Sequence, residues 1–323
     1  MALETRLLSR IGTLRQLEIF LKVAQEGSIA RAAEELHLSH SAVSIQVRKL
    51  SESLGLPLHE VLGKRLYLTE AGEEVVRAGR ELVDVVGRLD ERLSDLKGLG
   101  AGQLRVSVVT TAKYFLPRII GAFCKEYPGV DVEFKVGNRA EIIERFERNL
   151  DDIYVFSDPT EDMDIESYPF LPNPLVVVAS VDNPLAKRKK LSWQDLADES
   201  FLLREAGSGT DFALRRHLAK TGQSIDRRMV IASNEAIKFM VVENMGISIL
   251  SAYVLANARE DGLAQLRLPG FPIMSQWYVA KIPGKRLSGV AQRFLDFLRN
   301  RQRDVLPMRQ LEEQVERALG RKS

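Results

Sequence analysis

The chain has little of the chemistry that secreted and membrane proteins rely on. A single cysteine, Cys124, excludes an internal disulfide, so the fold must be stable without one. The first residues, "MALETRLLSRIG", lack the apolar stretch and small-residue cleavage site of an export signal. Apolar runs also stay well short of the roughly 18 residues that a membrane helix needs. These absences predict a cytoplasmic protein that uses no membrane.

A large excess of charge is absent as well. The formal net charge of +2 is too small to argue for nucleic acid by itself, so evidence for such a partner must be local. Apolar residues make up 45% of the chain and charged residues 28%, a balance typical of a folded globular protein. At about 100 to 200 residues per domain, 323 residues predict two or three domains.

Candidates for catalysis and metal binding are scarce. Three of the four histidines, His37, His40 and His59, fall in the N-terminal part, and only His217 falls later. His37 and His40 have i, i+3 spacing, but no third metal ligand lies near them in the sequence. An enzyme needs an activated nucleophile, an acid–base pair or a metal. We therefore predict no catalytic residue, no metal site, no cofactor and no enzyme activity.

The N-terminal part contains three helical patterns. Thr13 precedes apolar residues at helical spacing, and Gly27 follows them as a stop. Ser28 is placed to cap a short second helix, and Ser39 a third. The third helix has one apolar stripe, expected to face a core, formed by Val43, Val47, Leu50 and Leu54.

The opposite face of this third helix carries short polar side chains that no core requires. Ser41 and Ser44 can bond to base edges or phosphates, Ile45 can touch a thymine methyl, and Arg48 can reach a phosphate or guanine. Two short helices joined by a tight turn, with small polar residues on the second, form the helix-turn-helix that enters the major groove of DNA.

Downstream, "PLHEVLGKRLYLT" has Gly63 between two short apolar-rich runs, which predicts a hairpin with a basic tip. We interpret it as the wing of a winged helix-turn-helix that binds double-stranded operator DNA. The predicted DNA-binding residues are Ser28, Arg31, Ser39, His40, Ser41, Ser44, Ile45, Arg48, Lys64 and Arg65.

The stretch "SIARAAEELHLSHSAVSIQVRKL", followed by "LGLPL" and "RLYLTEAG", resembles the N-terminal signature of the LysR-type transcriptional regulators, a large bacterial family. That signature usually has Glu and Phe where this chain has Ser51 and His59, and the exchange affects the packing of the wing. The polar helix face matches the family pattern.

Apolar residues then recur every seven residues between Thr69 and Leu96, with a second set four residues after the first. Charged residues crowd the remaining positions, which favours a solvated helix that pairs with a second copy over a helix packed on its own domain. Pairing places two helix-turn-helix units on successive half-sites. The predicted dimerisation residues are Val75, Leu82, Val86, Leu89, Leu93 and Leu96.

The C-terminal two-thirds alternates β-branched runs with helical patterns, which predicts an α/β architecture with mostly parallel sheets. The resemblance implies two subdomains with a cleft, as in periplasmic solute-binding proteins. We expect the chain to cross between them twice, leaving near Leu171 and returning from about Leu266.

The predicted fold class is therefore α plus α/β, in five segments. Residues 1–69 form the winged helix-turn-helix, 70–97 the dimerisation helix and 98–103 a hinge rich in glycine. Residues 104–300 form the effector-binding domain of two α/β subdomains. The charged tail, residues 301–323, is either a short docking helix or a frayed end.

Polar strand-to-helix junctions in this domain suit a small anionic metabolite, because helix N-termini offer amide donors. The alternative is that these residues are ordinary helix caps. Glu205 is an awkward neighbour for an anion, so it binds a hydroxyl or amine or faces away. The predicted effector-binding residues are Thr110, Thr111, Lys113, Asn138, Arg204, Ser208, Gly209, Thr210, Ser233 and Asn234.

The segments "TTAKYFLP", "FLPNPLVVVAS", "LREAGSGT" and "SNEAIK" resemble the LysR-type branch that controls Rubisco and other carbon-fixation operons. The resemblance implies a nucleoid-associated regulator that often forms a homotetramer, responds to an anionic effector and can contact RNA polymerase. The alternatives are a LysR-type regulator of another operon, a solute-binding protein and an enzyme.

Overall fold

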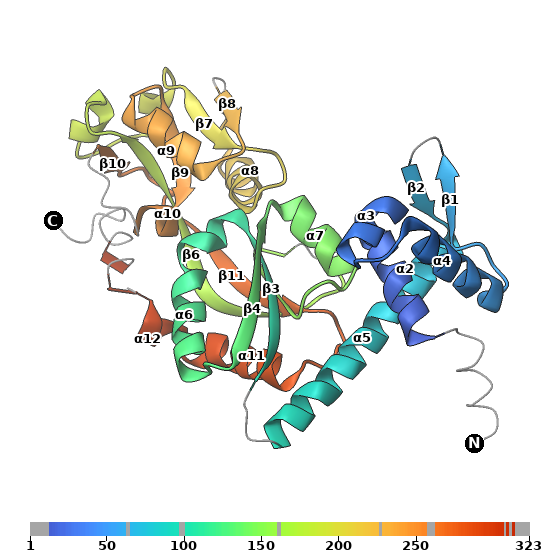
Figure 1. Cartoon of the computed structure of the whole chain (residues 1–323). Coiled ribbons are helices and arrows are strands. Elements are labelled where there is room, and N and C mark those ends of the chain that lie inside the picture. Colours follow the sequence, from blue (N-terminus) through green and yellow to red (C-terminus); the bar gives the residue numbers. More distant parts are fainter. Residues whose placement is uncertain are drawn as a thin grey trace. The chain divides into compact units, whose positions relative to one another are not determined.

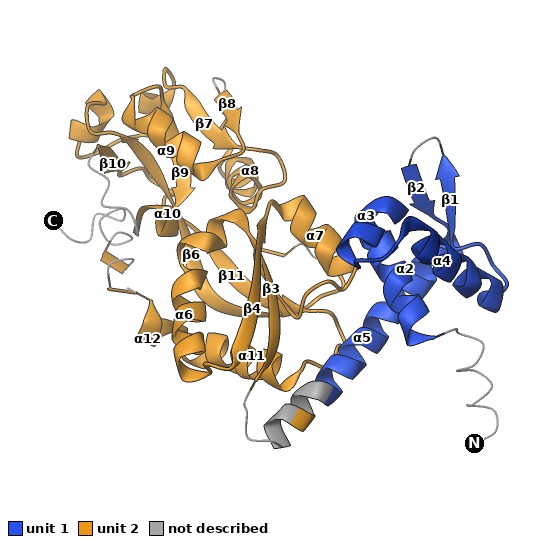
Figure 2. Ribbon diagram, in the orientation of Figure 1, with its two compact units in different colours: residues 1–90 blue, residues 91–323 orange. Residues whose placement is uncertain are grey.

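The computed structural model describes residues 13–62, 65–96, 101–159, 163–225, 228–256, 262–306, 308–309 and 312–313. The chain divides into two compact units, residues 1–90 and residues 91–323, coloured blue and orange in Figure 2. Figure 1 labels the elements of both units. Residues 98–100 of the predicted hinge lie outside the described residues, and Gly102 is already the first residue of a strand.

The first unit opens with three helices that begin at the predicted capping residues. Thr13 forms a capping box with Gln16. Ser28 and Ser39 each accept a backbone N–H from the first turn that follows, a bond that the helix itself cannot supply. The helices are α2 (Leu14–Glu26), α3 (Ile29–Glu35) and α4 (His40–Leu54).

These helices enclose one hydrophobic core. Val43, Val47 and Leu50 of α4 are fully buried against Phe20 of α2, as the apolar stripe predicts. Burying a side chain of this size contributes about 1.5 to 3 kcal/mol relative to leaving it in water. The core therefore fixes the rotation of α4 and leaves the opposite face at the surface.

The wing is a two-stranded antiparallel hairpin, as predicted. β1 (His59–Leu62) pairs with β2 (Arg65–Leu68), and Leu62 lies opposite Arg65 at the end next to the turn. The predicted tip residue Lys64 lies outside the described residues. Burial lowers the pKa of His59, whose Nδ1 is buried without a partner among the described residues. The neutral imidazole therefore occupies the position where the family signature has Phe.

α5 (Glu70–Leu96) is a long helix that begins inside the core of the first unit and continues past it. Gly79 is buried where a Cβ would lie 2.9 Å from Leu17 Cδ1, so this turn packs closely on α2. Val75 is also half-buried against this core. The first heptad of the predicted seam therefore packs within its own unit, and the exposed apolar face begins at Leu82.

In the second unit, the first half is a parallel sheet in the order β4-β3-β5. The β-branched runs "LRVSVV" and "VDVEFKV" predict β3 and β4, whereas the sequence pattern does not predict β5, whose five residues are all buried. The strands and helices are β3 (Gly102–Val109), the short 3-10 helix η1 (Thr110–Tyr114), α6 (Leu116–Glu126), β4 (Val130–Gly137), α7 (Arg139–Glu147) and β5 (Ile153–Ser157).

Two long antiparallel strands connect this half to the next, so the chain crosses twice as predicted. β6 (Glu166–Ser180) leaves the first half and β11 (Ile273–Lys281) returns to it. Leu266 and Leu268 pack in the core of the second half, so the return begins at Ile273 rather than near Leu266. The second unit is thus one continuous mixed sheet.

The second half continues this sheet in the order β6-β9-β7-β8, with β10 also paired to β6. β7 is parallel to β8 and β9, whereas β9 and β10 are antiparallel to β6, so the mostly parallel prediction holds only locally. One of the helical patterns in this alternation, "SWQDLA", forms only the short 3-10 turn η3 (Trp193–Leu196). The remaining elements are η2 (Pro184–Lys187), β7 (Phe201–Arg204), α8 (Gly209–Thr221), β8 (Arg228–Ile231), α9 (Asn234–Val242), β9 (Ile247–Ser251), α10 (Ala252–Ala256) and β10 (Leu263–Leu266).

The second unit has two hydrophobic clusters, one within the second half and one that contains residues of both halves, and α11 packs on the first half. α11 (Gly289–Asn300) packs on α6, where the rings of Phe294 and Phe123 pack edge to face with their centroids 5.0 Å apart. α12 (Gln302–Val305) follows, and Gln302 is buried, so the start of the predicted tail belongs to the folded unit. No described helix is long and apolar enough to cross a membrane.

Candidate functional sites

The polar face of α4 points away from the core, as predicted. His40, Ser41, Ile45 and Arg48 are exposed and Ser44 is half-buried. These five residues, called the reading face below, lie on one side of the helix because residues four apart share a face. The Arg48 side chain is 69% exposed, and its ion pair with Glu52 is long, with 3.8 Å between Nε and Oε1. The guanidinium can therefore reach outward to a phosphate or base.

Three of the predicted DNA-binding residues have structural roles in the unit. Ser28 and Ser39 cap α3 and α4, and the Ser39 hydroxyl also lies 3.1 Å from that of Ser41. Arg31 donates a hydrogen bond to the carbonyl of Glu26. Arg65 is exposed on the wing. Cap residues hold the helix N-terminus at the surface, where its amides can meet a phosphate.

The turn before α4 explains the position of His37. Its backbone is left-handed, with φ of 53°, so it ends α3 and reverses the chain toward α4. Groups of three or more His, Cys, Asp or Glu side chains able to hold a metal do not occur within the described residues. The structure thus gives this histidine a turn position rather than a ligand cluster.

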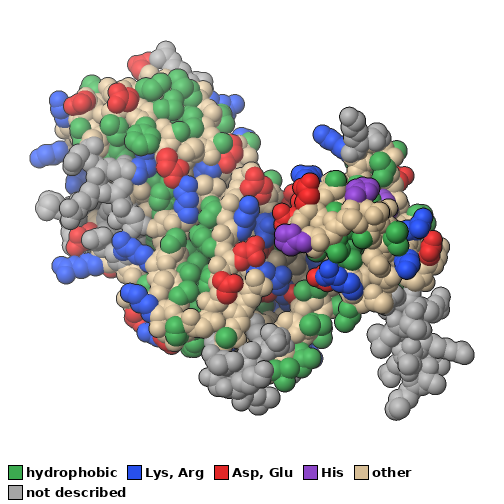
Figure 3. Space-filling model, viewed as in Figure 1, with side chains coloured by type: hydrophobic (Ala, Val, Ile, Leu, Met, Phe, Trp, Pro, Cys, Tyr) green, Lys and Arg blue, Asp and Glu red, His purple; other side chains and the backbone are tan. Residues whose placement is uncertain are grey.

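An apolar face runs along the part of α5 beyond the first unit's core. Leu82, Val86, Leu89 and Leu93 are between 40% and 57% exposed. Hydrophobic side chains gather at the surface along this helix in Figure 3. Leu96 belongs to α5, but its side chain lies outside those described. An apolar seam left in water on a long helix is the arrangement that a partner helix covers.

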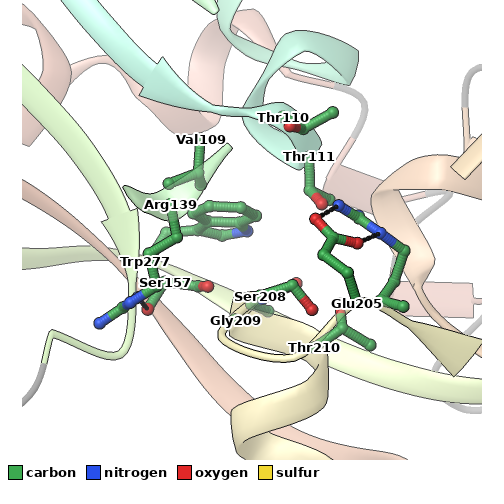
Figure 4. A pocket seen from close by; sticks show the side chains of 12 residues that line it. Val109, Thr110, Thr111, Arg139, Ser157, Glu205, Ser208, Gly209, Thr210 and Trp277 are labelled. Carbon is green, nitrogen blue, oxygen red and sulfur yellow. Dashed lines mark hydrogen bonds and ion pairs between the residues drawn. The ribbon is translucent and has the colours of Figure 1, made fainter. Parts of the chain in front are cut away.

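A polar pocket lies in the second unit where the two halves of the sheet meet (Figure 4). It contains about 340 Å³ of space not filled by protein, part of it open to solvent. Both halves contribute, at the C-terminal ends of β3, β5 and β7. The lining residues are Val109, Thr110, Thr111, Arg139, Ser157, Asn173, Arg204, Glu205, Ser208, Gly209, Thr210 and Trp277.

Six of the ten predicted effector-binding residues line this pocket: Thr110, Thr111, Arg204, Ser208, Gly209 and Thr210. Four do not. Asn138 caps α7 and Ser233 caps α9. Lys113 pairs with Glu235, and Asn234 lies behind the lining, where it bonds to Arg204. Asn138 and Ser233 therefore follow the plainer interpretation as helix caps.

A relay of hydrogen bonds orients Arg204 at the pocket. Its side chain is 3% exposed, and Nη1 donates to Asn234 Oδ1 at 2.8 Å. Asn234 Nδ2 in turn donates to Thr111 Oγ1 at 3.3 Å. Thr111 follows β3 and Asn234 begins α9, so the relay joins the two halves behind the pocket.

The carboxylate of Glu205 occupies the remaining edge of this guanidinium. Arg204 Nε and Nη2 each donate to one of its oxygens at 2.7 Å, the two bonds dashed in Figure 4. The expectation that Glu205 faces away was therefore wrong, because it lines the pocket and pairs with the adjacent arginine. Its binding of a ligand hydroxyl or amine stays a prediction.

Arg139, Ser157, Asn173 and Trp277 line the pocket and were not predicted. Arg139 donates to the carbonyls of Ser157 and Asp158, at 2.8 and 3.1 Å. It begins α7 shortly after β4, at the junction where Asn138 was predicted to bind the effector. Ser157 ends the strand that was not recognised, and Trp277 lies in the middle of β11, where no local pattern distinguishes it from core.

Gly209 explains why the loop before α8 contains glycine. A Cβ at this position would lie 1.8 Å from Ser157 Oγ, so the two halves touch here through the missing side chain. Gly207 has φ of 83°, which only glycine adopts readily. The glycine at position 209 is thus required by a close contact within the protein itself.

A second set of bonds joins the halves beside the pocket. Glu235 at the start of α9 accepts hydrogen bonds from Lys113 Nζ at 2.8 Å and Tyr114 Oη at 2.7 Å, both on η1. Partial burial opposes ionisation of Glu235, but these bonds outweigh it and lower its pKa to about 2. We call Lys113, Tyr114 and Glu235 the clasp.

The charges that line the pocket favour an anion only weakly. Arg139 and Arg204 contribute two positive charges and Glu205 one negative charge, which leaves one positive charge. The N-terminus of α8, thirteen residues long, adds amide groups and the positive end of a helix dipole. The lining contains no histidine or cysteine. The two arginines, the hydroxyls and the helix N-terminus offer hydrogen-bond donors that suit a small oxyanion.

Two family models match the chain and together cover both units. Residues 14–73 match the bacterial regulatory helix-turn-helix proteins of the lysR family. Residues 97–303 match the LysR substrate binding domain. The first match contains the reading face and the wing, and the second contains the pocket.

Curated relatives align along nearly their whole length. The transcriptional activator CmpR of Synechocystis sp. is 44% identical over 88% of this chain and 94% of its own. A RuBisCO operon transcriptional regulator of Acidithiobacillus ferrooxidans is 43% identical over 90% of this chain and 94% of its own.

A solved structure is similar to the second unit. The regulatory domain of Synechocystis CcmR, determined in complex with 2-PG, is 42% identical. It covers 64% of this chain and 98% of its own, with a TM-score of 0.59.

Proposed function

Because the chain belongs to the LysR family of bacterial DNA-binding transcriptional regulators, we propose that it controls carbon-fixation genes in response to a small anion bound in the pocket. The similarity to CmpR and to a RuBisCO operon regulator, both above 40% identity, supports this choice of target genes. A LysR-type regulator of another metabolic operon is the alternative within the family.

The observation that carries the proposal is that the pocket is lined by both halves of the second unit. Thr111 comes from the first half, whereas Ser208 and Arg204 come from the second. A ligand that bonds to both halves favours one relative arrangement of them. Its binding energy can shift that equilibrium only by its difference in affinity for the two states, commonly about 1 to 3 kcal/mol.

We propose that the effector is a small phosphorylated carboxylate, with 2-phosphoglycolate as the first compound to test. The CcmR regulatory domain bound to 2-PG supports this class. The positive end of α8, the hydroxyls of Thr111 and Ser208 and the guanidinium of Arg139 supply donors for such a molecule.

The exposed seam of α5 supports assembly into a homodimer, and through it a homotetramer, on two half-sites of an operator. In this proposal the protein acts in the cytoplasm on chromosomal DNA and influences RNA polymerase there. It binds its ligand without converting it. The similarity to proteins named as transcriptional regulators supports this non-enzymatic role.

A direct experiment is to sequence the chromosomal fragments bound to the protein in cells. We expect the fragments to lie beside genes for carbon fixation. Recovery of fragments beside unrelated operons would contradict the proposed targets, and absence of enrichment would contradict operator binding.

The pocket is tested by the double change Thr111→Val and Ser208→Ala. Operator binding should persist, while the effect of 2-phosphoglycolate on that binding should fall at least tenfold in apparent affinity, because two lining hydroxyls are lost. Thr221→Val is the matched control, since its hydroxyl bonds to His217 O at the far end of α8. A normal response in the double variant would place the effector elsewhere.

A further inference from the structure

The pocket contains an anion supplied by the chain itself. The Glu205 carboxylate binds Arg204 through two parallel hydrogen bonds of 2.7 Å. This bidentate geometry is how guanidinium groups hold the oxyanion of a carboxylate or phosphate. Glu205 therefore occupies the position on Arg204 that an anionic ligand would take.

We propose that Glu205 is a specificity-determining residue, an internal counter-ion that an incoming oxyanion must displace from Arg204. This inference rests on the proposed function, because it assumes that the pocket binds an anionic effector. It assigns Glu205 a role opposite to that of a ligand contact: the carboxylate competes with the effector.

The two partners differ in their freedom to move. The Arg204 side chain is 3% exposed, ends β7 and is held at Nη1 by Asn234. The Glu205 side chain is 26% exposed and is followed by the exposed residues Ala206 and Gly207. Displacement is therefore expected to move Glu205 toward solvent while the guanidinium stays in place.

Asn234 keeps the guanidinium aligned when Glu205 leaves. Its Oδ1 accepts from Arg204 and its Nδ2 donates to Thr111 across the two halves. The edge of Arg204 bearing Nε and Nη2 would then face the pocket with both donors parallel. An oxyanion that takes this edge becomes part of the relay that joins the halves.

The competition sets which ligands bind. A phosphate monoester or carboxylate offers two oxygens and can replace both bonds of Glu205, and further contacts to α8 or Arg139 make the exchange favourable. Chloride offers one acceptor site and inorganic phosphate lacks the second functional group of a metabolite. The apparent affinity of every anion is its intrinsic affinity multiplied by the fraction of protein in which Glu205 is displaced, so a stable Arg204–Glu205 pair weakens binding. Glu205 thus excludes simple ions that cannot make enough contacts.

The test measures binding of 2-phosphoglycolate and of inorganic phosphate to the full-length protein by titration calorimetry. Glu205→Gln keeps the shape of the side chain and removes its charge. We expect E205Q to bind 2-phosphoglycolate about tenfold more tightly, which is about 1.4 kcal/mol, and to bind inorganic phosphate measurably. Glu243→Gln is the control, because this residue is exposed at the other end of α9.

The double variant Arg204→Gln with Glu205→Gln separates the contact from the general charge. Its affinity should be no higher than that of the unchanged protein, because the gain in E205Q depends on the released guanidinium. A tighter double variant would overturn the inference, since the gain would then come from charge alone. Thermal unfolding of each variant checks that the fold is retained.

Unchanged or weaker binding of 2-phosphoglycolate by E205Q would also overturn the inference, and weaker binding would make Glu205 a direct ligand contact. If the unchanged protein and every variant fail to bind either anion, the proposed effector class fails, and the inference fails with it. If the unchanged protein binds 2-phosphoglycolate but E205Q binds it no more tightly, only the inference about Glu205 fails, and the proposed effector class stands.

Discussion

At the scale of single residues, the surface of α4 separates side chains that build the helix from side chains available to DNA. Ser39 caps the helix, and Val43, Val47 and Leu50 anchor it. Arg48 contributes to neither task, because its side chain is 69% exposed and its pair with Glu52 is long. Its role is therefore expected to be in DNA binding.

Replacing Arg48 with alanine should weaken operator binding about tenfold, and Ser44→Ala together with R48A should weaken it further. The change removes a charged donor from the reading face and no core contact, so folding and assembly should persist. Fluorescence anisotropy with operator DNA at several salt concentrations measures the affinity, and the salt slope should fall by about one if Arg48 neutralises a phosphate.

Arg148→Ala is a matched control, because Arg148, the C-cap residue of α7, also forms an i, i+4 ion pair with a glutamate and its side chain is 56% exposed. Loss of this arginine should leave operator affinity unchanged. Equal affinity of R48A and the unchanged protein would show that the reading face is wrongly assigned.

The pocket residues show how far local patterns reach at this scale. Thr111, Ser208 and Gly209 follow strands that the sequence predicts, so their junctions could be found. Local patterns could not identify Ser157 and Trp277 as pocket residues. Ser157 ends a strand that the sequence pattern does not predict, and Trp277 is a buried aromatic residue within a strand. The predicted residue Lys113 does not line the pocket, because its ammonium group pairs with Glu235.

At the scale of elements, α5 combines two packing environments in one helix. Its first turns lie in the core of the first unit, where Gly72 and Gly79 allow close approach of the backbone around Leu58 and of α2. Its later turns expose Leu82, Val86 and Leu89. A heptad pattern cannot distinguish the two, because both require apolar residues at the same spacing.

Replacing Leu89, which is 57% exposed, with aspartate should shift the protein toward monomer and weaken operator binding in parallel. A charge in a paired apolar seam is costly, and loss of pairing removes the second helix-turn-helix unit from the operator. Sedimentation velocity measures the oligomeric state. Glu81→Ala changes an exposed charged residue of the same helix outside the seam, and it should change neither the oligomeric state nor operator binding. If L89D formed a dimer of normal stability, the exposed seam of α5 would not be the dimer contact.

At the scale of the whole molecule, the second unit depends on how its two halves are joined. The clasp and the Arg204–Asn234–Thr111 relay connect them on one side of the pocket. The contact of Gly209 with Ser157 connects them on the other. Ligand binding at this junction is therefore expected to act on the arrangement of the halves.

The clasp gives the stability of the protein a specific dependence on pH. The pKa of Glu235 is lowered from 4.5 to about 2, so its bonds stabilise the folded state fully above about pH 4.5. This contribution is lost as the pH falls from there toward 2, because the folded state must then take up the proton. Glu235 is 44% exposed, so solvent screening keeps the effect below about 1 kcal/mol.

Glu235→Gln should therefore lower the free energy of unfolding at pH 7 by that small amount and have less effect at pH 3. Urea unfolding at pH 7, 5, 4 and 3 measures the difference from the unchanged protein. Glu243→Gln, at the other end of α9, should show no such trend. If the difference in free energy of unfolding stayed constant across this pH range, the charge of the Glu235 carboxylate would not be its cause.

The sequence by itself determined the elements whose signals are local. Capping serines, heptad spacing and the alternation of strands with helices predicted the winged helix-turn-helix, the long helix and the α/β domain, because each depends on neighbours a few residues apart. The division of that domain into two parts came from the family resemblance. Only the tertiary structure decided which polar junctions share a pocket and which charges neutralise each other. Arg204 meets Asn234, and Gly209 meets Ser157, across distances in the chain that no local pattern records.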